Sequence, residues 1–230
     1  MMSLPLRTRA LACALLVLPL SLAGCGSDGP GDATDTTAVA LAASDAPPAT
    51  ACPPADGSAA KQRTFAAAPP MCIDGARTYT ATMVTDKGTM VFRLLADKAP
   101  RTVNNFVVLA RYHYYDGITF HRVVPDFVLQ GGDPEGTGGG GPGYEFEDEL
   151  PGAGEYTIGS LAMANSGPDT NGSQFFVISG VNGTQLPPQY SLFGQLTEGQ
   201  ATVDAIAALA VGDGAPREPV TITSVTVVET

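Results

Sequence analysis

The chain is 230 residues long and 44% hydrophobic, so it can form one domain of ordinary size with a substantial core. It carries 23 acidic and 12 basic residues, which give a formal net charge of −11. Binding to nucleic acid needs clustered Lys and Arg that neutralise phosphate, so this balance argues against nucleic acid as a partner. We expect the acidic surplus to serve solubility.

The N-terminal segment is typical of a secretory signal peptide. Two arginines precede an apolar run over residues 10–22, which is shorter than the roughly 20 residues that a membrane span needs. The segment ends in "LAGC" (22–25), which resembles the lipobox of bacterial lipoproteins. This resemblance implies removal of residues 1–24, lipidation of Cys25 and an anchor on the extracytoplasmic face of the cell membrane. Ordinary signal cleavage and an uncleaved anchor are the alternatives.

A flexible tether is predicted for residues 25–75, because they are rich in Ala, Pro, Gly, Asp, Ser and Thr and show no sustained period. Besides Cys25, two of the four cysteines, Cys52 and Cys72, fall in this tether. In an oxidising compartment a structural disulfide is the default expectation for such a pair. A catalytic or metal-binding role is the sharper alternative, but neither cysteine has a neighbouring histidine.

The folded domain is expected to span residues 76–230. Residues 78–85 and 89–95 flank a short turn and predict a β-hairpin. A helix is predicted to start near Pro100. Its apolar face is formed by residues at positions i, i+3, i+4 and i+7, namely Val103, Phe106, Val107 and Ala110.

Further strand-like runs are separated by Gly/Pro-rich loops. These runs are residues 118–124, 127–130, 157–164, 174–179, 190–196 and 220–228. A second amphipathic helix fits "EGQATVDAIAALA" (198–210). Many strands with only two helices favour a mainly β fold, with a largely antiparallel sheet that is closed or nearly closed.

Several patterns that resemble functional sites are better explained as structure. Residues 136–141 match G-x-G-x-x-G, but Pro, Gly and an acidic run follow instead of a helix, so a surface loop is predicted. The acidic residues of 145–149 lack a calcium ligand ladder. His113 and His121 are too few for a zinc site, so no metal or cofactor is expected. A hydrolase that uses Ser173 with His121 would lack the G-x-S-x-G motif.

Two long segments carry a family resemblance. "FHRVVPDFVLQGGDP" (120–134) and "LAMANSGPDTNGSQFFV" (161–177) are similar to the two signatures of cyclophilins, the peptidyl-prolyl cis-trans isomerases. The loop "GTGGGGPGYEFEDE" (136–149) and the run "YSLFGQL" (190–196) resemble further parts of that family. The resemblance covers about residues 78–228 and implies a closed, eight-stranded antiparallel β-barrel capped by two helices.

The resemblance also implies the site. Arg122 takes the role of the catalytic arginine, assisted by Phe127 and Gln130. The residues implied to bind substrate are Val128, Ala164, Asn165, Gln174, Phe176, Leu186 and Tyr190. Of all these residues, Phe127 and Phe176 would form walls of the proline pocket. Gln130 and Asn165 would hold the substrate backbone, with Gln174 in support and Ala164 in the neighbouring groove.

Three positions depart from the family pattern. Val128 stands where methionine is common, and Tyr190 where histidine is frequent. The chain has no tryptophan, and Gln185 falls near the place where many members have one. The family resemblance implies that cyclosporin could bind. The missing tryptophan predicts that such binding is weakened, more so than catalysis.

The cis-trans isomerisation of an X-Pro bond needs few reactive groups. Rotation about an X-Pro bond makes and breaks no bond, but resonance sets a barrier of roughly 18–20 kcal/mol. A fixed donor aimed at the prolyl nitrogen would bind the twisted state better than either planar state. We therefore expect an isomerase acting on proline-containing peptides and unfolded exported proteins. The alternative is a non-catalytic cyclophilin-like module that binds Pro-containing segments.

Overall fold

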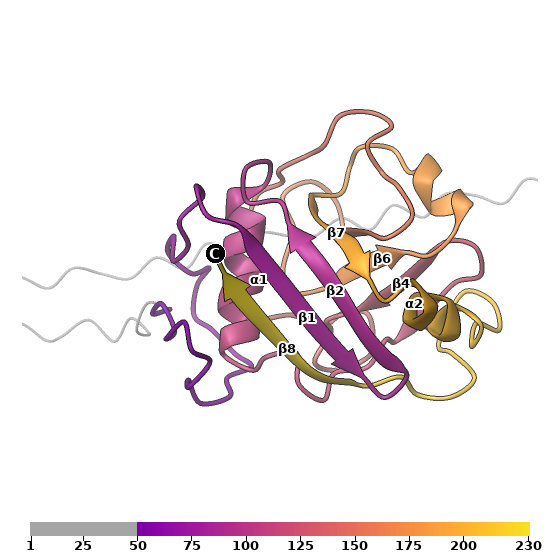
Figure 1. Ribbon diagram of the computed structural model, residues 1–230, viewed down its shortest axis with the longest axis horizontal. Coiled ribbons are helices and arrows are strands. Elements are labelled where there is room, and N and C mark those ends of the chain that lie inside the picture. Colours follow the sequence, from indigo (N-terminus) through magenta and orange to yellow (C-terminus); the bar gives the residue numbers. More distant parts are fainter. Residues whose placement is uncertain (1–49) are drawn as a thin grey trace, which may run out of the picture. The chain divides into compact units, whose positions relative to one another are not determined.

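A computed structural model of the chain describes residues 50–230 (Figure 1). The predicted signal peptide and the lipidation site at Cys25 therefore lie outside the described residues. Within residues 50–230, no helix is long and apolar enough to cross a membrane.

The described residues form one eight-stranded sheet in which every neighbouring pair is antiparallel. The strands are β1 (Tyr79–Thr85), β2 (Gly88–Leu94), β3 (Arg122–Val123), β4 (Val128–Gly131), β5 (Ser160–Met163), β6 (Phe175–Ile178), β7 (Leu192–Glu198) and β8 (Ile222–Glu229). Their order across the sheet is β3-β4-β6-β5-β7-β2-β1-β8. This confirms the predicted mainly β, antiparallel class. The strand-like runs 118–124 and 157–164 are shortened to β3 and β5.

The sheet curls, and its two end strands are connected through the segments that precede them. The backbone N–H of Phe120 donates to the carbonyl of Val220 (2.9 Å), and that of Ile222 donates to Ile118 (2.8 Å). In the described sheet order, β3 and β8 are not themselves neighbours. The expected closure is thus made by residues just before β3 and at the start of β8, which leaves the described residues closer to a curled half-barrel.

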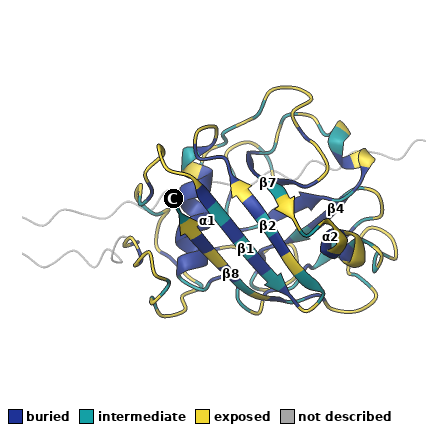
Figure 2. Cartoon of the chain, viewed as in Figure 1, coloured by how far each residue is buried: buried dark blue, intermediate teal, exposed yellow. Residues whose placement is uncertain are grey.

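Helix α1 (Pro100–Arg111) is buried from its third residue to its end, as its dark colour in Figure 2 shows. It begins with proline, as predicted, because proline lacks the N–H that would otherwise be unpaired in a first turn. The carboxylate of Glu149 accepts the backbone N–H groups of Arg101 (3.1 Å) and Thr102 (2.8 Å). Part of the acidic run 145–149 therefore caps this helix, where negative charge is favourable.

The other helices are short and lie at the edges of the sheet. α2 (Gln200–Ala207) packs its apolar residues Val203 and Ile206 into the core. A 3₁₀-helix, η1 (Val181–Gln185), follows β6 and was not expected from the sequence. Leu186, one of the residues implied to bind substrate, follows it directly.

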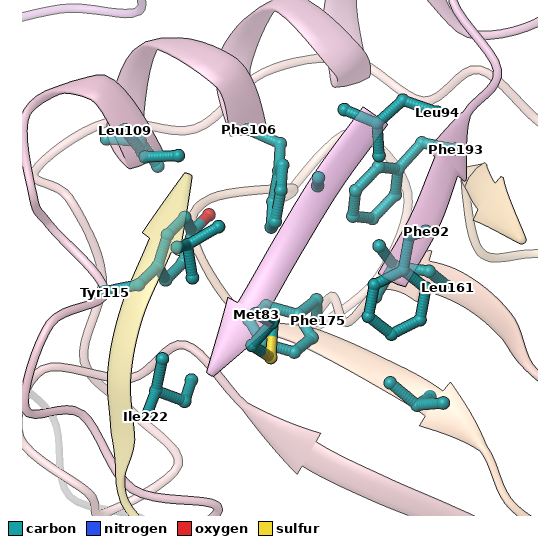
Figure 3. Close-up of a cluster of buried hydrophobic side chains, with 14 of the residues drawn as sticks. Met83, Phe92, Leu94, Phe106, Leu109, Tyr115, Leu161, Phe175, Phe193 and Ile222 are labelled. Carbon is teal, nitrogen blue, oxygen red and sulfur yellow. The ribbon is translucent and has the colours of Figure 1, made fainter. Parts of the chain in front are cut away.

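Alternation along the strands sorts their side chains into two apolar clusters. The larger cluster fills the space between the curled sheet and α1, where Phe106, Phe175 and Phe193 converge (Figure 3). The smaller one lies on the other side of β4, β5, β6 and β7, and consists of Leu95, Val128, Tyr156, Ala162, Phe176, Ile178 and Leu192. Successive strand residues point to opposite faces, so neighbouring residues serve different clusters.

Residues 50–75, which we call the N-terminal strap, differ from the predicted tether. They pack on the domain beside α1 (Figure 1), and Phe65 and Ile73 are buried in the larger cluster. A disulfide joins Cys52 to Cys72. The strap has no regular period because isolated apolar residues, rather than a continuous face, attach it. Residues 50–75 therefore belong to the folded part, which the sequence placed only from residue 76 onward.

Candidate functional site

Arg122 lies on β3, and its guanidinium is held by two partners. Nε and Nη2 donate to the two carboxylate oxygens of Asp213 at 2.5 and 3.0 Å. Nη1 donates to Oε1 of Gln130 at 3.1 Å, across the β3–β4 register that places the two residues opposite each other. A guanidinium has five N–H donors. The described partners use three of them, which leaves one on each terminal nitrogen for a ligand.

A chain of amide hydrogen bonds continues from this arginine. Gln130 Nε2 donates to Gln174 Oε1 (3.1 Å), and Gln174 Nε2 donates to the carbonyls of Gly138 and Gly140, both at 2.9 Å. In each of the two amides the oxygen accepts the hydrogen bond from the Arg122 side, and the nitrogen donates to the next group in the chain. This order of donors and acceptors orients Gln130 as an acceptor for the arginine and connects the site to the glycine-rich loop.

An apolar surface adjoins the guanidinium. The Arg122 Cζ atom lies 5.9 Å from the centre of the Phe127 ring. Around the smaller cluster, Val128 and Phe176 are buried. The half-buried residues that pack against this cluster are Phe127, Ala164, Leu186 and Tyr190. All six of these residues are among those that the sequence assigned to substrate binding or catalysis.

Tyr190 is fixed by two neighbours. Its ring meets Phe176 edge-on at a centroid distance of 5.4 Å. The hydroxyl of Tyr156 donates to the Tyr190 carbonyl (2.6 Å) and accepts its N–H (3.1 Å). Burial raises the pKa of Tyr156 to about 12, so it remains a neutral phenol that can donate. Tyr190 thus contributes a defined apolar face at the position where the family often has histidine.

A groove of about 610 Å³ lies next to the apolar surface. Its lining includes Gln130, Ala164, Asn165 and Gln174 and the loop 138–145. Asn165 Nδ2 donates to the carbonyl of Gln189 (2.9 Å). The backbone N–H and C=O of Asn165 have no hydrogen-bond partner within residues 50–230, so both can pair with an extended peptide.

The glycine-rich loop is organised by one buried carboxylate. Asp133, only 1% exposed, accepts the backbone N–H groups of Glu135 (2.7 Å), Thr137 (2.9 Å) and Gly138 (2.6 Å). Burial alone would raise the pKa of Asp133, but these donors outweigh burial and leave its pKa below the ordinary value. A Cβ at Gly140 would lie 2.0 Å from Asp133 Oδ1, so only glycine fits there. The loop is therefore more ordered than a permissive surface loop.

No charge at the site changes near neutral pH. The hydrogen bond from Arg122 lowers the pKa of Asp213, and the same contact raises the pKa of Arg122. Burial lowers the pKa of His121, so its imidazole is neutral at pH 7. The site consequently presents a permanent cation beside apolar groups.

The rejected hydrolase interpretation also fails on geometry. Ser173 is 1% exposed, and its hydroxyl donates to the carbonyl of Gly132 (2.7 Å) and contacts the hydroxyl of Tyr114 (2.7 Å). It is a structural residue that is not accessible to a substrate. Among residues 50–230 no group of three or more His, Cys, Asp or Glu residues is placed to hold a metal ion.

Three residues at the site were not anticipated from the sequence. Asp213 reaches Arg122 from 91 positions away, and its flanking glycines, both at positive φ, are the only local sign of an unusual turn. Asp133 stands inside the first signature but was given no role. Tyr156 looks like an ordinary core aromatic until its contact with Tyr190 is seen. Gln185, near the expected tryptophan position, is exposed on η1.

A curled antiparallel sheet with an arginine beside an aromatic surface, and with Ser173 buried, suits a site for binding rather than for covalent chemistry. The family model for "Cyclophilin type peptidyl-prolyl cis-trans isomerase/CLD" matches residues 80–227. The chain belongs to this family of enzymes.

Known relatives agree with this assignment. A Staphylococcus saprophyticus protein named "Putative peptidyl-prolyl cis-trans isomerase" is 42% identical over 178 residues, covering 64% of this chain and 90% of that protein. A Staphylococcus haemolyticus protein of the same name is 47% identical over 160 residues, with 56% and 81% covered.

Solved structures are similar as well. A Cryptosporidium parvum cyclophilin-type isomerase matches with a TM-score of 0.62 and 32% identity, covering 66% of this chain and 99% of that one. A second structure of that enzyme, determined in the presence of the dipeptide Ala-Pro, matches with a TM-score of 0.61 and 32% identity over the same shares.

Proposed function

We propose that this enzyme accelerates X-Pro isomerisation through a hydrogen bond from Arg122 to the prolyl nitrogen, and that it acts on exported proteins from a lipid anchor at Cys25. The observation that carries the first part is the placement of two uncommitted arginine N–H groups beside the half-buried Phe127 and the adjoining apolar cluster.

Catalysis on this proposal comes from preference for the twisted amide. In the planar states the nitrogen lone pair is delocalised into the carbonyl, so the nitrogen is a poor acceptor. At the twisted geometry the lone pair is localised, and a donor from Arg122 binds it more strongly. Such differential binding lowers the barrier, and about 7 kcal/mol would give a rate gain of about 10⁵.

The neighbouring groups would hold the substrate so that only one side rotates. Phe127, Phe176 and Leu186 would grip the pyrrolidine ring, while the free backbone groups of Asn165 pair with a flanking peptide. The ion pair with Asp213 and the bond to Gln130 hold the guanidinium plane in one orientation. Arginine suits this role because its donors lie in a rigid, permanently charged plane.

The central experiment replaces Arg122 in the full-length protein and follows isomerisation of a proline tetrapeptide. We expect Arg122→Ala to lower kcat/KM by about 100-fold, the usual effect of removing one donor to a transition state. Arg122→Lys should recover only part of the rate, because an ammonium lacks the planar fork. Arg93→Ala, which removes an exposed arginine of β2, is the matched control.

The same assay distinguishes isomerase from binding module. Full activity in Arg122→Ala would refute the catalytic role of the arginine. A wild-type protein that binds the proline peptide but leaves its isomerisation rate unchanged would support the non-catalytic alternative instead.

The anchor is tested separately. We expect mass spectrometry of the native protein to show a diacylated N-terminal Cys25, and Cys25→Ser to move the protein from the membrane fraction to the soluble fraction. The lipobox-like "LAGC" and the disulfide between Cys52 and Cys72 support an extracytoplasmic location. An unmodified N-terminus at another residue would contradict the anchor.

A further inference from the structure

The N-terminal strap is attached to the domain along the end of α1. The backbone N–H of Gln62 donates to the Tyr112 carbonyl (3.0 Å), and Lys61 Nζ and Arg63 Nη2 both donate to the Asp116 carbonyl (2.6 and 2.7 Å). The disulfide then closes the segment from Cys52 to Cys72 into a loop. These contacts place the middle of the strap over a cluster of tyrosines.

Phe65 is the residue that the strap inserts into this cluster. It is 4% exposed, and its ring lies 5.4 Å from that of Tyr112, 6.4 Å from that of Tyr114 and 6.3 Å from that of Tyr144, centroid to centroid. A buried phenylalanine with several aromatic partners resists displacement, because both its apolar area and its ring contacts are lost together.

The same residue is bonded to the loop that forms the groove. The Phe65 N–H donates to the Pro142 carbonyl (2.8 Å). A Cβ at Gly143, whose φ is +103°, would lie 2.6 Å from the Phe65 carbonyl oxygen, so the two backbones are in close contact. Pro142, Gly143 and Tyr144 all line the 610 Å³ groove beside Gln174. We call Pro142–Gly143–Tyr144 the groove wall.

The groove wall depends on the strap more than the rest of the loop does. The earlier part of the loop is held by the Asp133 carboxylate and the Gln174 amide. Within residues 50–230, the groove wall has one side-chain hydrogen bond, which the Tyr144 hydroxyl donates to Asn105 Oδ1 (2.5 Å). Phe65 supplies both a backbone bond and ring packing to this stretch.

We propose that Phe65 is a positioning residue for the substrate groove: the disulfide-closed strap holds the groove wall in the conformation that binds the residues flanking the proline. This inference rests on the proposed function, because it takes the groove as the place where an extended substrate lies. A substrate that consists of little more than X-Pro does not reach the wall, so Phe65 should affect long substrates selectively.

The test compares two substrates and two strap variants in the full-length protein. The short substrate is an acetylated, amidated Ala-Pro dipeptide, and the long one has at least four residues on each side of the same Ala-Pro. NMR exchange measurements give kcat and KM for each. We expect Phe65→Ala to raise KM for the long peptide about tenfold, with kcat for both peptides and KM for the short one changed by less than about twofold.

Ile73→Ala is the matched control, since Ile73 is also buried in the strap but, unlike Phe65, has no backbone hydrogen bond to the groove wall within residues 50–230. Ile73→Ala should leave kcat and KM near their wild-type values for both peptides. Phe65→Leu, which keeps most of the buried volume, should restore most of the affinity for the long peptide. If Phe65→Ala fails to fold, the Cys52→Ala/Cys72→Ala double variant takes its place, with a smaller rise of KM expected for the long peptide only.

An unchanged KM for the long peptide would overturn the proposal. So would an equal rise for both peptides, or an equal effect of Ile73→Ala, because either would indicate general destabilisation. If the wild-type protein isomerises neither peptide, the proposed function fails. The strap is then still tested by the dissociation constant of the long peptide, which Phe65→Ala should raise and Ile73→Ala should not.

Discussion

The two faces of β6 carry similar side chains that serve different purposes. Phe175 and Val177 belong to the larger cluster, to which the sheet, α1, α2 and the strap all contribute buried residues. Phe176 and Ile178 point into the smaller cluster, which is flanked by half-buried groups and borders the candidate site. The difference lies in what covers the residues, not in their chemistry. An apolar face that is fully covered stabilises the fold, and one that is left partly open can bind a ligand.

The same division recurs on the neighbouring strands. Leu129, Leu161 and Phe193 belong to the closed cluster. Their chain neighbours Val128, Ala162 and Leu192 belong to the open one. The site is therefore built on the back of the core strands, where a rigid scaffold holds its residues. Adjacent pairs of residues allow stability and activity to be separated experimentally.

The largest effect on stability is expected from Phe175→Ala. Its ring is fully buried and meets three other rings edge-on at centroid distances of 5.6–6.1 Å. Truncation should lower the free energy of unfolding by about 3–5 kcal/mol, because the lining of the cavity cannot collapse. Urea denaturation measures this loss. A change below about 1 kcal/mol would contradict the assignment of Phe175 to a tightly packed core.

The adjacent change, Phe176→Ala, should act mainly on activity. We expect the free energy of unfolding to fall by only about 1–3 kcal/mol, because the surrounding half-buried groups can close over the space. The KM for a proline tetrapeptide should rise at least about tenfold, because a wall of the proposed proline pocket is removed. If the two variants behaved alike in both assays, the contrast between the two faces would be wrong.

A smaller effect is expected from Gln174→Ala. The change removes the link between Gln130 and the carbonyls of Gly138 and Gly140. Loss of about 1 kcal/mol of positioning should lower kcat about fivefold. Gln195→Ala is the control, because Gln195 is also hydrogen-bonded but lies on β7 away from Arg122. Equal losses in both variants would argue against the amide chain as a positioning device.

The smallest effect is expected from pH, with a rate that is flat between about pH 6.5 and 9. The pKa of Asp213 is lowered below 3.8, so its ion pair is complete above that value and is lost only as pH falls through the folded-state pKa. The pKa of His121 is lowered below 6.5, so stability from its neutral form is lost only as pH falls below that value. A bell-shaped profile centred near pH 7 would instead indicate acid–base catalysis.

Much of the fold could be predicted because its signals are local. Alternation in residues 78–85 and 89–95 gave the hairpin within two residues of its observed ends, and the periodic face around Phe106 gave α1. Both follow from the geometry of a single element. The long signatures then indicated which of these strands carry site residues, and the structure places Arg122, Gln130 and Gln174 in one hydrogen-bonded chain.

The features that were missed depend on contacts between distant segments. Apart from Pro53, the strap buries two apolar side chains, Phe65 and Ile73, which lie eight residues apart, so no window of sequence shows a face that must be covered. Asp213 meets Arg122 only after α2 and the following loop have returned to β3. The run 118–124 contains the residues that close the sheet, but only its last part pairs as β3. The hydrophobic periodicity of a single segment does not predict these contacts between distant segments.

On the proposed extracytoplasmic location, the disulfide between Cys52 and Cys72 would link completion of the strap to the compartment in which the protein resides. Thiols stay reduced in the bacterial cytoplasm, and disulfides form on the far side of the membrane. A copy that folded in the cytoplasm before the proposed export would lack this disulfide. The position of the groove wall, and with it the binding of long peptides, would then depend on Phe65 alone. If the protein is exported as proposed, we expect a copy whose two cysteines are still reduced to bind long proline peptides more weakly than the oxidised protein does.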